Sequence, residues 1–318
     1  MKAILIINPK SGKIKRKMPP ILKWTFKKLE KSVAGVSTPK TTAAEIIEEV
    51  RKSCVKENIK LDIEYTKHPM HAMELAKGAK NKYDMVIVAG GDGTVNEVIN
   101  GIIDSKIILA IIPFGSTNVL ALELGIPFNA KEASELILHG KKLRIDLGYA
   151  KTKEEARYFS MMVEVGFVPK LIEGVNLKVR KRWGNLSYFL SGIRQIITYR
   201  WYNIHVEHKS RSVGYLVIVS NSKDYAGEYQ IAEKASATDG LLDLVVINRK
   251  GLGGIIKFLS SVLIGKSNTF LRGEYYQIKE AHIYCRHKML VQVDGELLGT
   301  APVDVKVVPK ALTVMVKR

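Results

Sequence analysis

The chain has 318 residues, of which 46% are hydrophobic, and its mean hydropathy is 0.00. This length allows two domains with apolar cores, and the composition is typical of a soluble globular protein and excludes a disordered one. The formal net charge of +19 predicts an anionic partner: a nucleotide, a nucleic acid or an acidic membrane. The two cysteines, Cys54 and Cys285, lie far apart, so we expect no disulfide framework and a cytoplasmic setting. We expect neither a membrane span nor a signal peptide.

The first half of the chain alternates short apolar strands with helical segments. Strands are predicted at 3–7, 61–65, 85–89 and 107–112, and helices at 43–57, 71–80, 95–103 and from residue 119 on. Thr42 precedes the helix at 43–57 and is predicted to cap it. Such alternation predicts a parallel sheet with helices on both faces and right-handed crossovers.

Glycine-containing turns follow three of these strands. They are Asn8-Pro-Lys-Ser-Gly12, Gly90-Gly-Asp-Gly-Thr94 and Pro113-Phe-Gly-Ser-Thr-Asn118. Glycines let backbone N–H groups approach an oxygen-rich ligand, and a helix N-terminus adds unpaired donors. Because parallel strands end at one edge of the sheet, the turns should converge on a nucleotide site. Asp92 would repel a bare phosphate, so we expect a divalent cation there. Taken alone, the second turn is also compatible with an ordinary helix start capped by Asp92 or Thr94.

From about residue 146 on, β-type patterns dominate the sequence. Strands are predicted at 158–166, 201–208, 214–220, 241–247, 275–285, 289–293, 303–308 and 312–316, and helices near 170–181, 186–199 and 252–264. Many strands alternate apolar and polar residues, which suits an antiparallel sheet or sandwich. We therefore expect an α/β domain at 1–145 and a β-rich domain at 146–302.

Two surface features have alternative interpretations. Residues 13–33 are densely basic and predict an amphipathic helix, which either packs on the sheet, the interpretation we favour, or touches a membrane. The basic stretches 13–31 and 178–183 are the candidates for a membrane-facing surface. His68 and His71 lack partners at metal-ligand spacing, so we interpret them as surface residues.

Together these motifs resemble the catalytic domain of the diacylglycerol kinase family, which includes soluble bacterial lipid kinases and sphingosine kinases. Besides the three turns, Asn96-Glu97, the segment 235–243, Val293-Asp-Gly-Glu296 and the segment 305–312 carry the resemblance, which extends over essentially the whole chain. It implies an α/β first domain with a parallel sheet, as in NAD kinases, and a mainly antiparallel β-sandwich second domain. It also implies ATP bound between the domains and last strands, about 303–318, that return to the first domain.

The resemblance further implies roles for individual residues. Glu296 would be the general base, Asp92 would organise Mg²⁺ and the phosphates, and Asp146 would support them in a carboxylate–water network. The residues lining ATP would be Asn8, Thr66, Gly90, Gly91, Asp92, Gly93, Thr94, Asn96, Glu97 and Ser116. A structural Mg²⁺ would be held by Asp239 and by backbone oxygens of Ser236 and Leu241. From the residues alone, Asp294-Gly295 predicts a hairpin turn, and Glu296 is either a base or a solvated neighbour of that turn.

These observations lead us to expect an ATP- and Mg²⁺-dependent lipid kinase that acts on diacylglycerol and yields phosphatidic acid. Its partners would be the lipid and an anionic membrane surface, with which a cytoplasmic enzyme would associate peripherally. The alternatives are an NAD kinase-like enzyme and a catalytically silent membrane-binding regulator of the same fold. We expect no nucleic-acid partner, because the chain has no aromatic-studded basic strand face or recognition helix. The identity of the lipid and the formation of a homodimer are left open.

Overall fold

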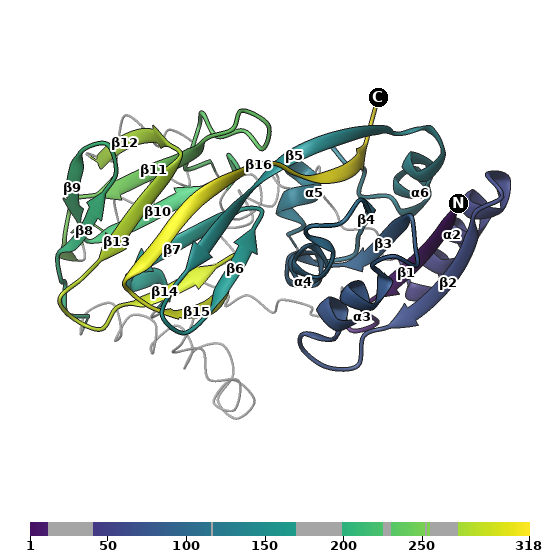
Figure 1. Cartoon of the computed structure of the whole chain (residues 1–318), viewed down its shortest axis with the longest axis horizontal. Helices are drawn as coiled ribbons and strands as arrows, with labels where there is room; N and C mark the ends of the chain where they lie inside the picture. Colours follow the sequence, from purple (N-terminus) through teal and green to yellow (C-terminus); the bar gives the residue numbers. More distant parts are fainter. Residues whose placement is uncertain (12–40, 116, 170–198, 225–229, 252, 255–272) are drawn as a thin grey trace, which may run out of the picture.

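The computed structural model describes residues 1–11, 41–115, 117–169, 199–224, 230–251, 253–254 and 273–318 (Figure 1). The basic segment 13–33, Ser116 and the basic stretch 178–183 lie outside these residues. The helices predicted near 170–181, 186–199 and 252–264 lie entirely or almost entirely outside them. Among the helices that are described, none is long and apolar enough to cross a bilayer.

Four parallel strands form the sheet of the first half, as predicted. In spatial order they are β2 (Lys60–Tyr65), β1 (Lys2–Ile7), β3 (Met85–Gly90) and β4 (Ile108–Pro113). β3 is buried along its whole length, which explains its unbroken run of apolar residues. The helices of this half are α2 (Ala43–Lys56), α3 (His71–Ala79), α4 (Asp92–Ile102), α5 (Val119–Glu123) and α6 (Ala130–His139). The four strands end at the same edge, where the turns after them lie side by side.

Two helix starts show how local sequence sets this geometry. Thr42 caps α2 as predicted: its side chain accepts the N–H of Glu45, and the Glu45 carboxylate accepts the N–H of Thr42. Helix α4 begins three residues before the predicted start at Val95. Its first residue is Asp92 and its N-cap is Gly91, so the glycine motif is itself the first turn of the helix.

The second half is a sandwich of β-strands, which confirms the predicted fold class. Its strands are β5 (Lys141–Lys151), β6 (Ala156–Phe159), β7 (Met162–Gly166), β8 (Ile204–Glu207), β9 (Arg211–Gly214), β10 (Leu216–Ser220), β11 (Leu242–Ile247), β12 (Gly273–Ile278), β13 (Glu280–Tyr284), β14 (Leu290–Val293), β15 (Glu296–Thr300) and β16 (Val303–Val316). One sheet is antiparallel, in the order β12-β11-β10-β7-β14-β15. Its apolar face, with Val163, Val217 and Val246, packs against the other sheet through Ile283 and Val305.

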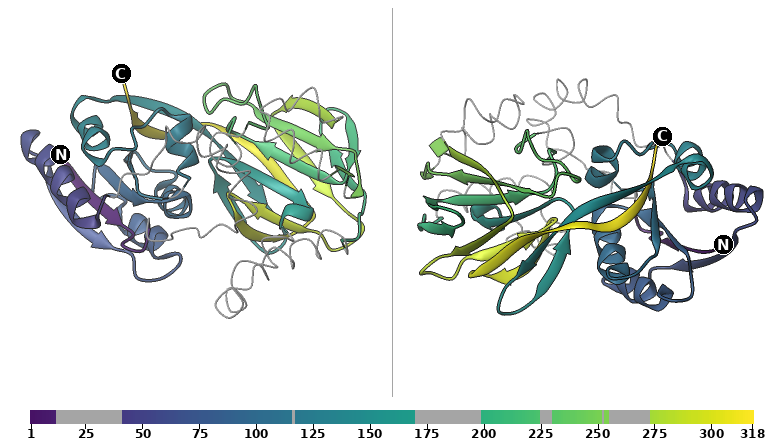
Figure 2. Two further views of the ribbon diagram at one scale, coloured as in Figure 1. Left: turned by 180° about the vertical axis from the view of Figure 1, so that it is seen from behind. Right: turned by 45° about the horizontal axis from the view of Figure 1, so that its top comes forward.

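The longest strands, β5 and β16, connect the two halves. β16 pairs antiparallel with β5 over most of its length and parallel with β4 at Thr313 and Val314. A single mixed sheet therefore continues from β4 through β16 and β13 into the sandwich, and Figures 1 and 2 show the two strands running side by side between the halves. The sequence predicted two strands, 303–308 and 312–316, where the structure has one, with a register shift between Val308 and Leu312.

Candidate active site

A cleft of about 730 Å³ opens at the carboxyl edge of the parallel sheet. Its walls come from the turns after β1, β2, β3 and β4 and from the first residue of β15. Eight of the predicted site residues line it, namely Asn8, Thr66, Gly91, Asp92, Gly93, Thr94, Glu97 and Glu296. The fold thus gathers into one cleft the motifs that the sequence places up to nearly 300 residues apart.

The second and third glycine turns are in direct contact in this cleft. A Cβ atom on Gly115 would lie only 2.4 Å from the Cα of Gly91. Gly91 has a φ of −90°, which other residues also adopt, so a left-handed backbone does not explain why position 91 is a glycine. The close approach of two backbones requires glycine here. Gly90 lies beneath Thr94, whose Cβ would be 2.6 Å from an added Cβ, and it does not line the cleft.

The carboxylate of Asp92 fixes the third turn. Its Oδ2 accepts a hydrogen bond from the Thr117 hydroxyl at 2.6 Å, and its Oδ1 accepts the N–H of Val119, the first residue of α5, at 2.7 Å. A carboxylate has about four acceptor positions, so both oxygens can also bind a cation. Hard oxygen ligands of this kind suit Mg²⁺, and Asp92 therefore fits the role that the resemblance gives it.

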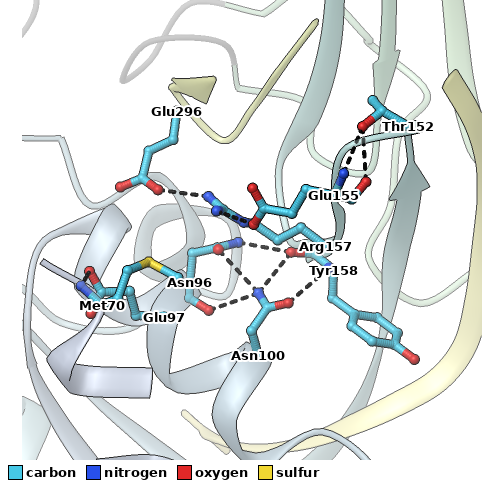
Figure 3. A network of polar contacts seen from close by, with 9 residues as sticks. All are labelled: Met70, Asn96, Glu97, Asn100, Thr152, Glu155, Arg157, Tyr158 and Glu296. Carbon is cyan, nitrogen blue, oxygen red and sulfur yellow. Dashed lines mark hydrogen bonds and ion pairs between the residues drawn. The ribbon is translucent and has the colours of Figure 1, made fainter. Parts of the chain in front are cut away.

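Hydrogen bonds also tie the turn after β1 to α4, and the segment after β2 to both β1 and α4. The side-chain amide of Asn8 donates to the Thr94 hydroxyl at 3.1 Å, and the backbone N–H of Thr66 donates to Ile7 at 3.0 Å. Glu97 lines the cleft, yet its carboxylate lies against Met70 (Figure 3) and accepts the N–H groups of Met70 and Ala72, both at 3.0 Å. Glu97 therefore caps the start of α3, a structural role that the motif alone did not indicate.

Two further residues of the predicted site lie outside the cleft lining. Asn96 is buried, and its amide donates to Asp294 at 2.8 Å and to the Tyr158 carbonyl at 3.1 Å. Asp146 is also buried, and its carboxylate accepts the N–H of Gly240 at 2.6 Å and that of Lys310 at 2.7 Å. Both bonds of Asp146 go to backbone N–H groups, so its carboxylate holds two segments that lie far apart in the sequence against β5.

Glu296 reaches the cleft from a tight hairpin. Asp294 and Gly295 have φ values of 47° and 88°, which confirms the predicted turn. The buried carboxylate of Asp294 anchors the turn by accepting N–H groups from Ser160, Met161 and Met162, in addition to Asn96. Burial raises the pKa of Asp294 to about 6, against the lowering effect of these donors.

The side chain of Glu296 lies over the start of α4 (Figure 3). A Cβ atom on Gly93 would be 3.4 Å from its Oε1. Its Oε2 accepts a hydrogen bond from the Arg157 guanidinium at 2.7 Å, and 46% of the side chain remains exposed. A carboxylate therefore stands beside the N–H donors of the helix start.

The loop predicted to hold a structural cation lies on the second half. Asp239 is exposed, and its Oδ1 accepts the N–H of Leu241 at 3.0 Å, while the Ser236 hydroxyl lies 3.2 Å from that of Thr238. Asp243 is fully buried and bonded to the Tyr275 hydroxyl, and burial raises its pKa to about 6. The two carboxylates on either side of Gly240 thus face different environments. The oxygen atoms of Asp239 and Ser236 are of the kind that Mg²⁺ prefers as ligands, whereas the buried Asp243 is not available to the same ion.

The cleft also contains residues that sequence reasoning did not assign. Lys10, Lys67 and His68 bring positive or titratable groups to its rim, and Thr117 binds Asp92. Lys10 and Thr117 belong to the recognised turns, so their motifs could have indicated them. Arg157 had no such signal, because it follows Glu154-Glu155 in a stretch typical of a solvated surface.

His68 and His71 do have a third potential ligand, contrary to the sequence interpretation. One potential metal-ligand atom from each of His68, His71 and Glu74, a ring nitrogen or a carboxylate oxygen, lies within 4.8 Å of the other two. However, Nδ1 of His71 accepts the N–H of Lys67 at 3.1 Å, so the proton of the neutral ring is on Nε2. A ring in this state offers no second lone pair, and the geometry does not favour a metal here.

Residues 33–150 match the family model "Diacylglycerol kinase catalytic domain", and residues 162–316 match the "YegS C-terminal NAD kinase beta sandwich-like domain". The diacylglycerol kinase of Bacillus subtilis (strain 168) is 29% identical over 234 residues, which are 71% of this chain and 75% of that protein. The diacylglycerol kinase of Staphylococcus saprophyticus is 27% identical over 308 residues, which are 95% of this chain and 90% of that protein.

A solved structure has the same fold. The crystal structure of a diacylglycerol kinase from Bacillus anthracis str. Sterne superimposes with a TM-score of 0.72 at 23% identity, covering 99% of this chain and 97% of the other. The two family models together include all the strands and turns that build the cleft except β1 and its turn. The chain therefore belongs to the diacylglycerol kinase family of lipid kinases.

Proposed function

We propose that this chain is an ATP- and Mg²⁺-dependent kinase that phosphorylates a lipid hydroxyl, with diacylglycerol as the acceptor and phosphatidic acid as the product. One observation carries the proposal: Oε1 of Glu296 would be only 3.4 Å from a Cβ on Gly93, in the first turn of α4. A proton acceptor is thereby held beside the backbone donors of a helix start. Phosphoryl transfer to an alcohol needs both groups at one place.

The phosphate side of the cleft is supplied by the glycine motif. Unpaired N–H groups at the start of α4 and the partial positive charge of the helix end favour phosphate oxygens. Lys10 and Lys67, on the neighbouring turns, add positive charge along the same wall. Asp92 would hold Mg²⁺, which when bound neutralises phosphate charge and aligns the transferred group. ATP would therefore lie along the turns after β1, β2, β3 and β4.

The acceptor side requires a base, because an alcohol is a poor nucleophile at neutral pH. In the proposed reaction the lipid hydroxyl oxygen forms a bond to the γ-phosphorus while the bond from that phosphorus to the bridging oxygen of ADP breaks. The hydroxyl proton passes to the carboxylate of Glu296. Such a base contributes about 10²–10⁴ in rate. The half-exposed side chain of Glu296 is accessible to an acceptor entering the cleft.

The proposal is tested with labelled ATP, Mg²⁺ and a panel of lipid alcohols that includes diacylglycerol. Glu296→Gln should lower kcat by about two orders of magnitude with folding intact, since it keeps the shape of the side chain and removes its basicity. Asp92→Asn should instead impair use of the magnesium–nucleotide complex. Glu132→Gln, which alters an exposed carboxylate on α6, is the matched control. Phosphorylation of NAD without any lipid product, or lipid binding without turnover, would replace this proposal by one of the two alternatives.

We also propose that the enzyme docks on an anionic membrane surface, because its acceptor resides in a bilayer. The basic stretches 13–31 and 178–183 are the candidates, and each Lys or Arg near such a surface is worth about 1 kcal/mol. Sedimentation with vesicles should show binding that depends on anionic lipid and weakens with salt. Equal binding to neutral vesicles would contradict this electrostatic account.

A further inference from the structure

We propose that Arg157 is a positioning residue that holds the Glu296 carboxylate in place to receive the acceptor proton. This inference rests on the proposed function. Nη1 of Arg157 donates to Oε2 of Glu296 at 2.7 Å, and Nη2 donates to Oε1 of Glu155 at 2.6 Å (Figure 3). The arginine side chain is only 8% exposed, whereas those of Glu155 and Glu296 are 43% and 46% exposed.

This burial separates the Arg157–Glu296 pair from an ordinary surface ion pair. Exposed pairs contribute little, because ordering two long side chains costs conformational entropy. Here the interior already orders the arginine, so only Glu296 remains to be fixed. A half-exposed glutamate otherwise samples several rotamers. With Oε2 bound to the guanidinium, Oε1 is the oxygen left over Gly93.

The strand that carries Arg157 is fixed to the helix that forms the phosphate site. The side chain of Asn100, on α4, bonds both backbone groups of Tyr158: its amide donates to the Tyr158 carbonyl, and its carbonyl accepts the Tyr158 N–H, both at 2.9 Å. Asn96 donates to the same carbonyl at 3.1 Å (Figure 3). Strand β6 therefore positions the base relative to α4, since Arg157 is the residue next to Tyr158.

The segment around Arg157 also holds the far end of β15, at Thr300. Glu154, in the β5–β6 turn, accepts the Thr300 hydroxyl at 2.7 Å, while Arg157 binds Glu296 at the start of the strand. The second carboxylate, Glu155, shares the positive charge of the guanidinium. Arg157 can therefore orient Glu296 without cancelling the negative charge that a base needs.

The test is a double-mutant cycle on kcat, with diacylglycerol as the acceptor. Arg157→Met keeps the length of the side chain and removes the cation, so kcat should fall about 10- to 100-fold while KM for ATP changes less than about 2-fold. Arg157→Lys keeps a positive charge next to Glu296, so it should retain most of the wild-type kcat. In the Glu296→Gln background, Arg157→Met should lower kcat no further. Arg144→Met is the control, because it removes an exposed arginine of strand β5 that bonds the Lys310 carbonyl.

The outcomes separate this inference from the proposed function. If Glu296→Gln loses turnover and Arg157→Met keeps it, Arg157 does not position the base, and the kinase proposal stands. If Glu296→Gln itself keeps turnover, the assignment of the base fails. A further loss from Arg157→Met in the Glu296→Gln background would show that Arg157 acts on another group. Should Arg157→Met not fold, Arg157→Gln, which keeps a hydrogen-bond donor and removes the cation, decides the question: wild-type kcat in that variant would overturn the inference.

Discussion

Replacing Gly115 by alanine tests whether the contact between two glycine turns builds the phosphate site. The added Cβ would lie 2.4 Å from the Cα of Gly91 and 2.7 Å from Oδ1 of Asn118, whereas real Cβ atoms essentially never approach other atoms within 3.0 Å. The turns must therefore separate by at least about 0.6 Å. Backbone atoms have to make that movement, because Gly91 has no side chain that could turn away.

The size of the effect follows from this displacement. Forcing an extra carbon into a packed contact costs about 1–3 kcal/mol of unfolding free energy. A displacement approaching 1 Å in a site that aligns reacting groups can cost about 10²-fold in rate. We therefore expect Gly115→Ala to lose about 1–3 kcal/mol of stability and about 10- to 100-fold in kcat/KM for ATP.

Urea unfolding and initial rates over a range of ATP concentrations measure both quantities. Gly78→Ala is the matched control, because Gly78 lies exposed in α3 with open space around its added Cβ. Alanine in a helix interior is favoured over glycine by about 0.5–1 kcal/mol, so the control should be stabilised with unchanged kinetics. Wild-type stability and wild-type KM for ATP in Gly115→Ala would refute the reasoning.

Three other predictions concern anchors of the fold. Burial raises the pKa of Asp294 from 3.8 to about 6, so the folded state binds this proton more tightly than the unfolded state. The stability that the proton contributes is therefore fully present below pH 4 and is lost as the pH rises through 6. Relative to Asp294→Asn, the wild type should lose up to about 3 kcal/mol of unfolding free energy between pH 4 and 7.5, and parallel pH curves would contradict this. If Mg²⁺ binds at Asp239, chelation should lower the melting temperature of the wild type and leave that of Asp239→Ala unchanged. Thr42→Ala should cost about 1 kcal/mol in urea unfolding by removing the capping box with Glu45, and a loss within error would show that tertiary packing alone holds α2.

Local patterns predicted the framework of the molecule. The apolar run at 85–89, the cap at Thr42 and the turn at Asp294-Gly295 depend on interactions within a few residues, and the structure confirms them. The convergence of the glycine turns followed from the geometry of a parallel sheet. Strand β5, at 141–151, was not predicted, because its pairing with β16 joins distant parts of the sequence.

Side-chain partners explain where the sequence was insufficient. The motif that contains Asn96 and Glu97 predicted nucleotide contacts, but Asn96 binds Asp294, 198 positions away, and Glu97 caps a different helix. Arg157 and Glu296 are 139 positions apart in the sequence, and no motif indicates that they form an ion pair. No local periodicity encodes contacts of this range, so a list of motif residues cannot separate those that face a ligand from those that support the fold.

The position of β16 has a consequence for the biogenesis of the protein. This strand is translated after all the other described strands, yet it lies between β4 and β13, where Thr313 and Val314 pair with Ile108 and Leu109. While the ribosome is still translating the sandwich, β4 has no neighbour on that side and exposes an unpaired strand edge, which is a template for aggregation. A premature stop that removed β16 would therefore damage the half that contains the parallel sheet, which was made long before it.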